Sequence, residues 1–89
     1  MSIITPIDPV LDLIYSSQDI VIHLKTLNLN NYQVLEEIRP LIKQLVYNWE
    51  ILDNFFSNYI IEIPEDSFNH KYHMYIKKYL PYFKYLLQK

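Results

Sequence analysis

The sequence predicts an all-α protein: a three-helix up-down-up antiparallel bundle with a long, Pro-kinked central helix. Within residues 31–59, large apolar side chains recur at alternating steps of three and four residues, a spacing that keeps them on one face of an α-helix. Two further segments, 9–27 and 65–88, carry helical apolar patterns of their own. Turn-forming residues separate the three segments, and short connections favour antiparallel neighbours. The apolar line of the central segment consists of Leu35, Ile38, Ile42, Leu45, Trp49, Leu52, Phe56 and Tyr59.

The first predicted helix covers residues 9–27. Asp8 is a suitable N-cap, and Pro9 fits the first helical position, where a missing N–H costs nothing. Residues 20–25 could instead form a short strand, because Ile22 and Leu24 alternate with His23 and Lys25. Because residues 59–63 are rich in β-branched side chains, the alternative is an α+β fold in which 20–25 and 59–63 form a strand pair.

The central helix is predicted to begin just after the turn that ends at Asn30. Asn30 can cap it, with Gln33 reaching back to the cap and Leu29 packing onto Val34. Pro40 removes one backbone hydrogen bond and crowds the preceding turn. The apolar spacing nevertheless continues in phase across this proline, so we expect a kink in one helix rather than two separate helices.

The last predicted helix covers residues 65–88. It follows Pro64 and carries acidic residues in its first turn, where the helix dipole favours negative charge. Pro81 is expected to kink or split it near its end. Together the segments form a single helical domain, residues 1–89, because a chain of this length has no room for a second domain.

The composition excludes several kinds of site. The chain has no cysteine and no glycine, which removes disulfides, thiolate nucleophiles and the glycine-rich loops that hold phosphates. No cofactor is expected. Neither a signal peptide nor an apolar run of transmembrane length is visible, so we expect a cytoplasmic protein without membrane contact.

Charge is distributed unevenly along the chain. All ten carboxylates lie at or before Asp66, where only three basic residues accompany them, giving that part a net charge of −7. Residues 67–89 carry five lysines and no acid, giving +5. This polarity, together with 14 aromatic residues counted as Trp, Tyr and Phe, indicates a protein that binds through its surface.

The acidic and aromatic side chains of the central helix are the first candidate for a partner-binding surface. Trp49 is most simply a core residue, but a partly exposed tryptophan beside aromatic neighbours would be a binding hot spot. The carboxylates could dock a basic partner. The predicted partner-binding residues are Glu36, Glu37, Tyr47, Trp49, Glu50, Asp53 and Phe55.

The last helix offers an alternative surface, because it interleaves lysines with tyrosines. Lysines follow phosphates and aromatic rings stack on bases, so this pattern fits a nucleic-acid-binding face. An ordinary amphipathic helix produces the same pattern, and the acidic remainder of the molecule repels nucleic acid. The predicted nucleic-acid-binding residues are Lys71, Tyr75, Lys77, Lys78, Tyr82 and Lys84.

Metal binding and catalysis are weaker interpretations. Asp66, His70 and His73 would share one face of a helix, but a divalent-metal site needs a further ligand, and the histidines are expected to be polar surface groups. The carboxylates of the central helix accompany no nucleophile or recognisable catalytic motif. We therefore expect no catalytic residues, no metal and no enzyme activity.

The sequence thus predicts a small, non-catalytic protein-binding module: an adaptor, an inhibitor or an antagonist of a larger protein. It would act through an aromatic, charge-polarised helical surface. The partner is another protein, or a second copy of the chain in a homodimer. Nucleic-acid binding by the last helix is the alternative.

Overall fold

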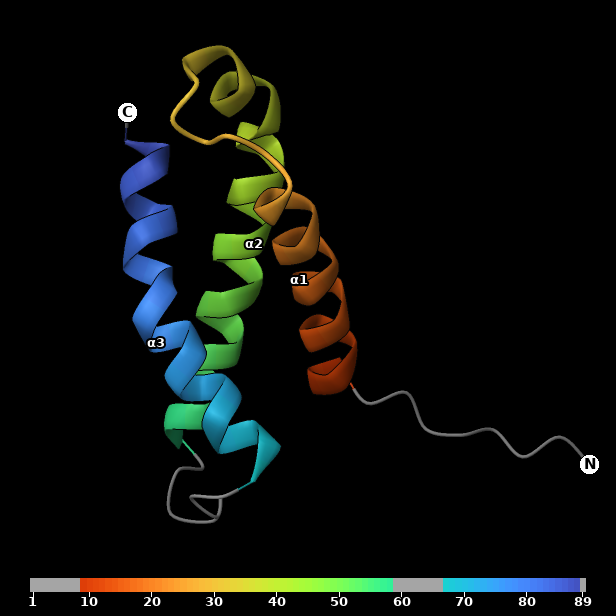
Figure 1. Cartoon of the computed structure of the whole chain (residues 1–89). Coiled ribbons are helices and arrows are strands. Elements are labelled where there is room, and N and C mark those ends of the chain that lie inside the picture. Colours follow the sequence, from red (N-terminus) through yellow and green to blue (C-terminus); the bar gives the residue numbers. More distant parts are fainter. Residues whose placement is uncertain (1–8, 59–66, 89) are drawn as a thin grey trace, which may run out of the picture.

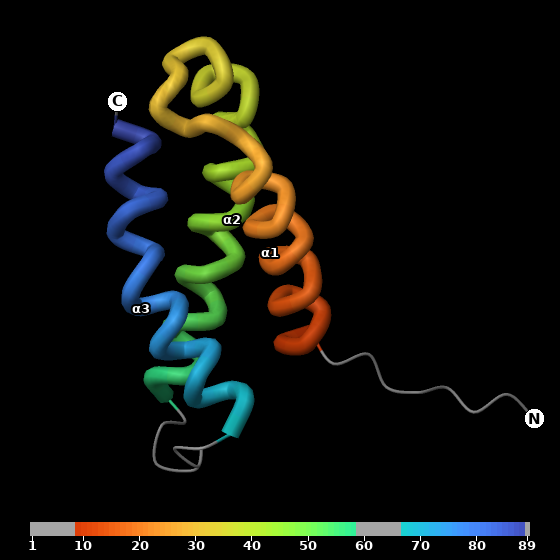
Figure 2. Tube along the Cα trace, in the orientation of Figure 1, coloured from red at the N-terminus to blue at the C-terminus, as the bar shows by residue number. Residues whose placement is uncertain are grey.

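In a computed structural model of the chain, residues 9–58 and 67–88 are described. They form three α-helices, α1 (Pro9–Lys25), α2 (Tyr32–Asn58) and α3 (Phe68–Leu87). Figures 1 and 2 show α1 and α3 running in one direction and α2 in the other, with α2 in the middle. The predicted all-α, up-down-up bundle is confirmed.

The alternative strand at 20–25 is wrong, because this segment lies inside α1. Val21 and Leu24 are buried against the bundle, three residues apart, whereas Ile22 is 61% exposed. Helical periodicity therefore outweighs the local alternation of apolar and polar residues. The proposed partner strand, 59–63, lies outside the described residues, as does the predicted N-cap Asp8.

The core is built on the predicted apolar line of α2. Its seven described members are all buried, and the side chain of Trp49 is 0% exposed; the eighth, Tyr59, lies outside the described residues. Replacing a buried tryptophan of this kind by alanine typically lowers the free energy of unfolding by about 3–5 kcal/mol. The buried members are Leu35, Ile38, Ile42, Leu45, Trp49, Leu52 and Phe56.

Helix α2 packs against both of its neighbours, whereas α1 and α3 have few close backbone approaches to each other. Each outer helix thus buries one stripe of side chains against α2. The sides of α1 and α3 that face one another are left partly open. This arrangement leaves a recess between α1 and α3.

The first turn of α2 corrects one predicted cap. The side-chain oxygen of Asn31, and not that of Asn30, accepts hydrogen bonds from the backbone N–H groups of Gln33 (2.9 Å) and Val34 (3.4 Å). The side chain of Asn28 instead accepts a bond from the backbone of Asn30 (3.1 Å), closing the turn before the helix. Three of the four residues 28–31 are asparagines, so the sequence alone does not show which of them caps the helix.

Helix α2 continues through Pro40, as the apolar spacing predicted, and its first turns are inclined to the remainder (Figures 1 and 2). Arg39, next to the proline, donates a hydrogen bond to the backbone carbonyl of Leu87 (2.9 Å). This contact ties the first half of α2 to the end of α3, across 48 residues of sequence.

Helices α1 and α3 are both shorter than predicted. Helix α1 ends at Lys25 rather than at residue 27. Helix α3 begins at Phe68 rather than at residue 65, because Ser67 is extended and caps it by accepting a bond from the backbone N–H of His70. Pro81 lies inside α3 without ending it. No helix in the described part of the chain combines the length and the apolar character needed to cross a membrane.

The cap of α2 gives a direct test of this local structure. Replacing Asn31 by alanine should lower the free energy of unfolding by about 0.5–2 kcal/mol, because two backbone N–H groups lose their acceptor. The matched change Asn30→Ala should cost less than about 0.5 kcal/mol, since its side chain caps nothing. Urea unfolding followed by circular dichroism measures both. Equal losses for the two variants would contradict the assignment of the cap.

Candidate binding groove between α1 and α3

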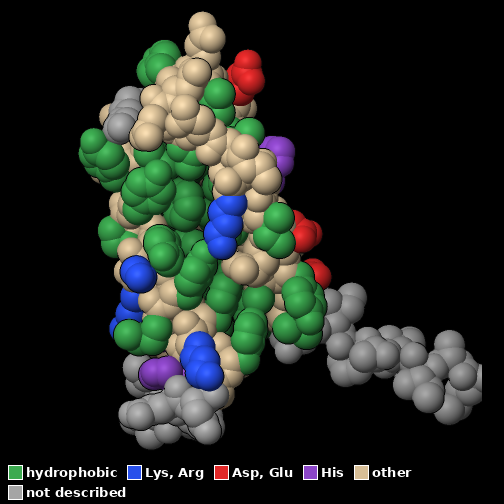
Figure 3. All heavy atoms as spheres, in the orientation of Figure 1, with side chains coloured by type: hydrophobic (Ala, Val, Ile, Leu, Met, Phe, Trp, Pro, Cys, Tyr) green, Lys and Arg blue, Asp and Glu red, His purple; other side chains and the backbone are tan. Residues whose placement is uncertain are grey.

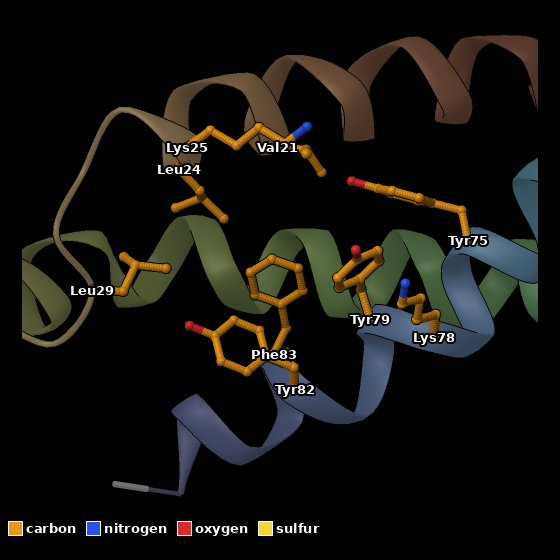
Figure 4. Close-up of a pocket in the computed structure, with 9 residues that line it drawn as sticks. All are labelled: Val21, Leu24, Lys25, Leu29, Tyr75, Lys78, Tyr79, Tyr82 and Phe83. Atoms are coloured by element: carbon orange, nitrogen blue, oxygen red, sulfur yellow. The ribbon is translucent and has the colours of Figure 1, made fainter.

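A groove of about 500 Å³ lies between α1 and α3, within the size range of ligand sites in proteins. Figure 4 shows side chains of both helices, and of the connection after α1, converging on it. The lining residues are Val21, Leu24, Lys25, Leu29, Tyr75, Lys78, Tyr79, Tyr82 and Phe83.

A second hollow, of about 260 Å³, continues the groove toward the start of α3. It shares Lys25 and Tyr75 with the first, so we treat the two as one surface, the α1–α3 groove. On α3 the lining extends from Phe68 to Phe83, which are about 22 Å apart along the axis at 1.5 Å per residue. The second hollow is lined by Gln18, Lys25, Phe68, Lys71, Tyr72 and Tyr75.

Aromatic rings make the α3 wall of the groove. Tyr75 packs edge-on against Trp49, with ring centres 5.8 Å apart, and its ring lies 4.7 Å from that of Tyr79. Tyr82 contacts Phe83 at 5.2 Å and remains 44% exposed. These side chains recur every three or four residues, so one side of α3 presents a continuous aromatic surface.

The rim of the groove is positively charged. Lys25, Lys71 and Lys78 are exposed, and no carboxylate among the described residues lines the groove. The Lys78 ammonium lies 5.3 Å from the centre of the Tyr79 ring, a cation–π contact. None of the three lysines forms an ion pair within the described part of the chain. Figure 3 shows apolar side chains gathered on this face with basic ones among them.

One hydrogen-bond chain crosses beneath the groove and joins all three helices. The indole N–H of Trp49 donates to the hydroxyl of Tyr72 (3.0 Å), which donates to the side-chain oxygen of Gln18 (2.9 Å). Burial raises the pKa of Tyr72 to about 12, against the opposing effect of the bond from Trp49. The phenol therefore remains a neutral donor well above neutral pH.

Two of the predicted partner-binding carboxylates are engaged between α2 and α3. Glu50 forms an ion pair with Lys84 (2.9 Å), and Asp53 lies 2.7 Å from a ring nitrogen of His73. Both therefore interact with another helix of the same chain. A free acidic docking surface at these positions would require their present contacts to break.

The other two predicted carboxylates lie in the first half of α2. Glu36 accepts a hydrogen bond from Arg39 (2.6 Å), and this bond lowers the pKa of the Glu36 carboxyl below its ordinary value. Glu37 is exposed and has no ion pair within residues 9–58 and 67–88. Of the four acids, Glu37 is thus the one available to a partner without a competing contact.

The aromatic members of the predicted set are separated by the fold. Trp49 is fully buried, so its simpler interpretation as a core residue holds and it does not reach the surface. Tyr47 and Phe55 are 62% and 37% exposed. Neither of them lines the α1–α3 groove.

The predicted nucleic-acid-binding set is divided between two sides of α3. Its members Lys71, Tyr75, Lys78 and Tyr82 line the groove. Lys77 is exposed but does not line it. Lys84 faces α2, where it pairs with Glu50. Four of the six predicted residues are brought together on one surface.

His73 corrects a sequence-based expectation, because it is buried (2% exposed) rather than a surface group. Its ring contacts that of Phe56, with centres 5.4 Å apart, in addition to its bond with Asp53. Asp66, which the sequence placed with His70 and His73 as a candidate metal site, lies outside the described residues. The described residues contain no group of three or more His, Asp and Glu side chains placed to hold a metal ion.

Sequence reasoning missed the α1 wall of the groove. Gln18, Val21 and Lys25 lie within residues 9–27, which the sequence predicts as a helix without assigning these three residues to a site. Their steps of three and four residues place them on adjoining stripes of one helix, which was the signal available. This spacing shows that the three residues lie on one side of α1, but it does not show which other helix that side contacts.

Comparisons of the chain with models of known protein families, with curated proteins and with solved structures found no match.

The hydrogen-bond chain beneath the groove yields a stability prediction. Replacing Tyr72 by phenylalanine should lower the free energy of unfolding by about 1–3 kcal/mol, because the indole N–H of Trp49 and the side-chain oxygen of Gln18 lose their buried partner. Urea unfolding at neutral pH, followed by circular dichroism, measures this loss. The matched variant Tyr47→Phe, at an exposed position, should change stability little.

The raised pKa of Tyr72 also predicts a dependence on pH. Below about pH 10 the phenol is neutral in both the folded and the unfolded chain, so its contribution to stability is complete. Between about pH 10 and pH 12 the unfolded chain ionises first, so the free energy of unfolding should fall. Tyr72→Phe should show a smaller fall than the wild type and than Tyr47→Phe. Identical slopes in the three proteins would contradict the assignment.

Proposed function

We propose that the chain is a non-catalytic protein-binding module, an adaptor or inhibitor, that takes a segment of another protein into the α1–α3 groove. The observation that carries the proposal is the groove itself: an aromatic and apolar trough, open along its length and edged by Lys25, Lys71 and Lys78. Recessed apolar surfaces with convergent polar groups are the usual binding sites of proteins.

The shape of the groove suits a helical segment. It runs between two parallel helices for about 22 Å, the length of about 15 residues of α-helix. An amphipathic helix binds such a trough through apolar side chains at steps of three and four residues. A helix in this place would cover the sides of α1 and α3 that the bundle leaves partly open.

The chemistry of the lining favours a partner with acidic flanks and apolar anchors. Tyrosine rings such as those of Tyr75 and Tyr82 supply large contact areas at low entropic cost, which is why tyrosine is enriched at interfaces. The three rim lysines have no ion-pair partner within the described residues. Complementary charge on the partner would set orientation and association rate more than affinity.

The acidic residues of α2 give less support to a binding surface than the groove does. Glu36, Glu50 and Asp53 already have partners in the chain. A basic partner would have to compete with those contacts. The lysines of the groove carry no such cost, so we favour an acidic partner over the basic partner that the sequence suggested.

Nucleic-acid binding is the second candidate, favoured by four predicted residues that meet in the groove. Stacking on bases, however, needs exposed ring faces. Tyr75 and Tyr79 are partly buried and pack against each other, which leaves Tyr82 as the most exposed tyrosine of the lining. Binding of labelled oligonucleotides should therefore be weak, and this distinguishes the two candidates.

Site-directed photo-crosslinking tests the proposal. A photoreactive phenylalanine analogue in place of Tyr82, at the edge of the groove, should form adducts of defined mass with a protein in an extract of the cells that make this chain. The same analogue in place of Tyr47 is the matched control, because Tyr47 is at least as exposed as Tyr82 (62% against 44%) but does not line the groove. We expect adducts from position 82 and few or none from position 47.

Charge reversal in the groove supplies the second arm of this experiment. Lys71→Glu combined with Lys78→Glu should reduce the adducts from position 82 several-fold, since the positive rim is lost. Lys43→Glu combined with Lys77→Glu changes the net charge equally at exposed positions away from the groove, and should leave the adducts unchanged. Adducts that form equally from both positions, or that nuclease removes, would overturn the proposal.

A further inference from the structure

We infer that helix α1 of a second copy of the chain occupies the α1–α3 groove when no other partner does, so that the free protein is a symmetric dimer with its binding surface closed. The inference rests on the proposed function, because it takes the groove as a binding surface and names one occupant. It also adds a regulatory step, since a partner must displace the second copy.

Helix α1 carries an exposed apolar stripe of the kind that the groove accepts. Leu11, Tyr15 and Ile22 are all exposed, and their spacing of four and seven residues places them on one side of the helix. Gln18 and Lys25 continue the same heptad stripe, and both line the groove. The exposed stripe therefore adjoins the groove directly, and Figure 3 shows apolar side chains on this face over both helices.

The charges beside the stripe complement those of the groove. Asp12 and Asp19 are exposed, have no ion pair within the described residues and lie seven residues apart on α1. Lys71 and Lys78 are also seven residues apart, on α3. Each pair thus spans about 10.5 Å along its helix axis. The two aspartates of one copy therefore have the same spacing along the helix axis as the two lysines of the other.

A twofold axis allows the apolar stripes and the charged pairs of both copies to be matched at the same time. The stripe and the groove adjoin each other on one copy, so a rotation of 180° places the stripe of each copy over the groove of the other. The interface is then closed, and it does not propagate into fibres. The two α1 helices run antiparallel when the axis is perpendicular to them, and the apolar surface of both copies is covered in one step.

Sedimentation of the intact chain tests the inference. The wild type should dissociate from dimer to monomer on dilution, with tighter association at low ionic strength, where charge pairing is least screened. Asp12→Lys with Asp19→Lys should weaken the dimer about tenfold or more, because two attractive pairs on each side of the twofold axis become repulsive. Lys71→Asp with Lys78→Asp should do the same.

Combining all four substitutions reverses every pair and should restore dimerisation to nearly the wild-type value. The matched control, Lys43→Asp with Lys77→Asp, alters exposed lysines outside the groove and should leave the dimer unchanged. All substituted residues are exposed, and circular dichroism verifies that each variant is folded. Tyr15→Glu gives an independent arm, because it places a charge within the apolar stripe and should dissociate the dimer.

A chain that stays monomeric at every concentration overturns the inference, as does a dimer that is insensitive to these charge reversals or is not restored by their combination. The proposed function fails separately. If the chain never dimerises but position 82 crosslinks to another protein, the proposed function stands and only the dimer is ruled out. Crosslinking of position 82 to another copy alone would support the dimer and remove the heterologous partner.

Discussion

The buried contact of Trp49 with Tyr72 is the interaction on which the rest of this structure depends. Trp49 lies in the middle of α2, fully buried, with the rings of Tyr75 and Phe83 packed edge-on against it. Its indole N–H needs an acceptor in a place that water does not reach, and the Tyr72 hydroxyl accepts that bond while donating its own hydrogen bond to the side-chain oxygen of Gln18. A buried aromatic of this size is worth about 3–5 kcal/mol, whereas an exposed ion pair such as that of Lys84 is worth about 0.2–1 kcal/mol. Hydrophobic burial therefore holds the bundle together, and the hydrogen-bond chain fixes how its three helices are aligned.

That alignment explains why a groove exists. Gln18 connects α1 to α3 by accepting a hydrogen bond from the hydroxyl of Tyr72, and both outer helices otherwise pack mainly on α2. Tyrosine side chains of α3 line the space between this helix and α1 (Figure 4). Their hydroxyl groups favour contact with water, while their rings cover the core. The same residues thus complete the hydrophobic core and leave a recessed aromatic surface beside it.

The fold divides the charged side chains of the molecule into two groups: those that form ion pairs within the chain and those that do not. The carboxylates of α2 that face α3 are held by Lys84 and His73. The lysines that face α1 have no such partners in the described residues, although the chain as a whole is acidic. A basic groove in an acidic protein is the feature that unites the proposed partner chemistry with the proposed self-association, because α1 itself is an acidic amphipathic helix.

The sequence by itself determined the helices and the core. The apolar line from Leu35 to Phe56 required one long helix with a buried face, and it outweighed the proline at position 40 because the side chains stay in phase across it. Local pattern was a poorer guide to the cap of α2, where adjacent asparagines are chemically equivalent and only the backbone conformation selects Asn31. The groove that we propose as a binding surface was decided by the tertiary structure alone. Whether Lys78 lies near Glu50 or over the ring of Tyr79, and whether Gln18 contacts solvent or Tyr72, depends on how the helices are rotated about their axes. That rotation is set by the packing of side chains from different helices, which periodicity along one helix does not encode.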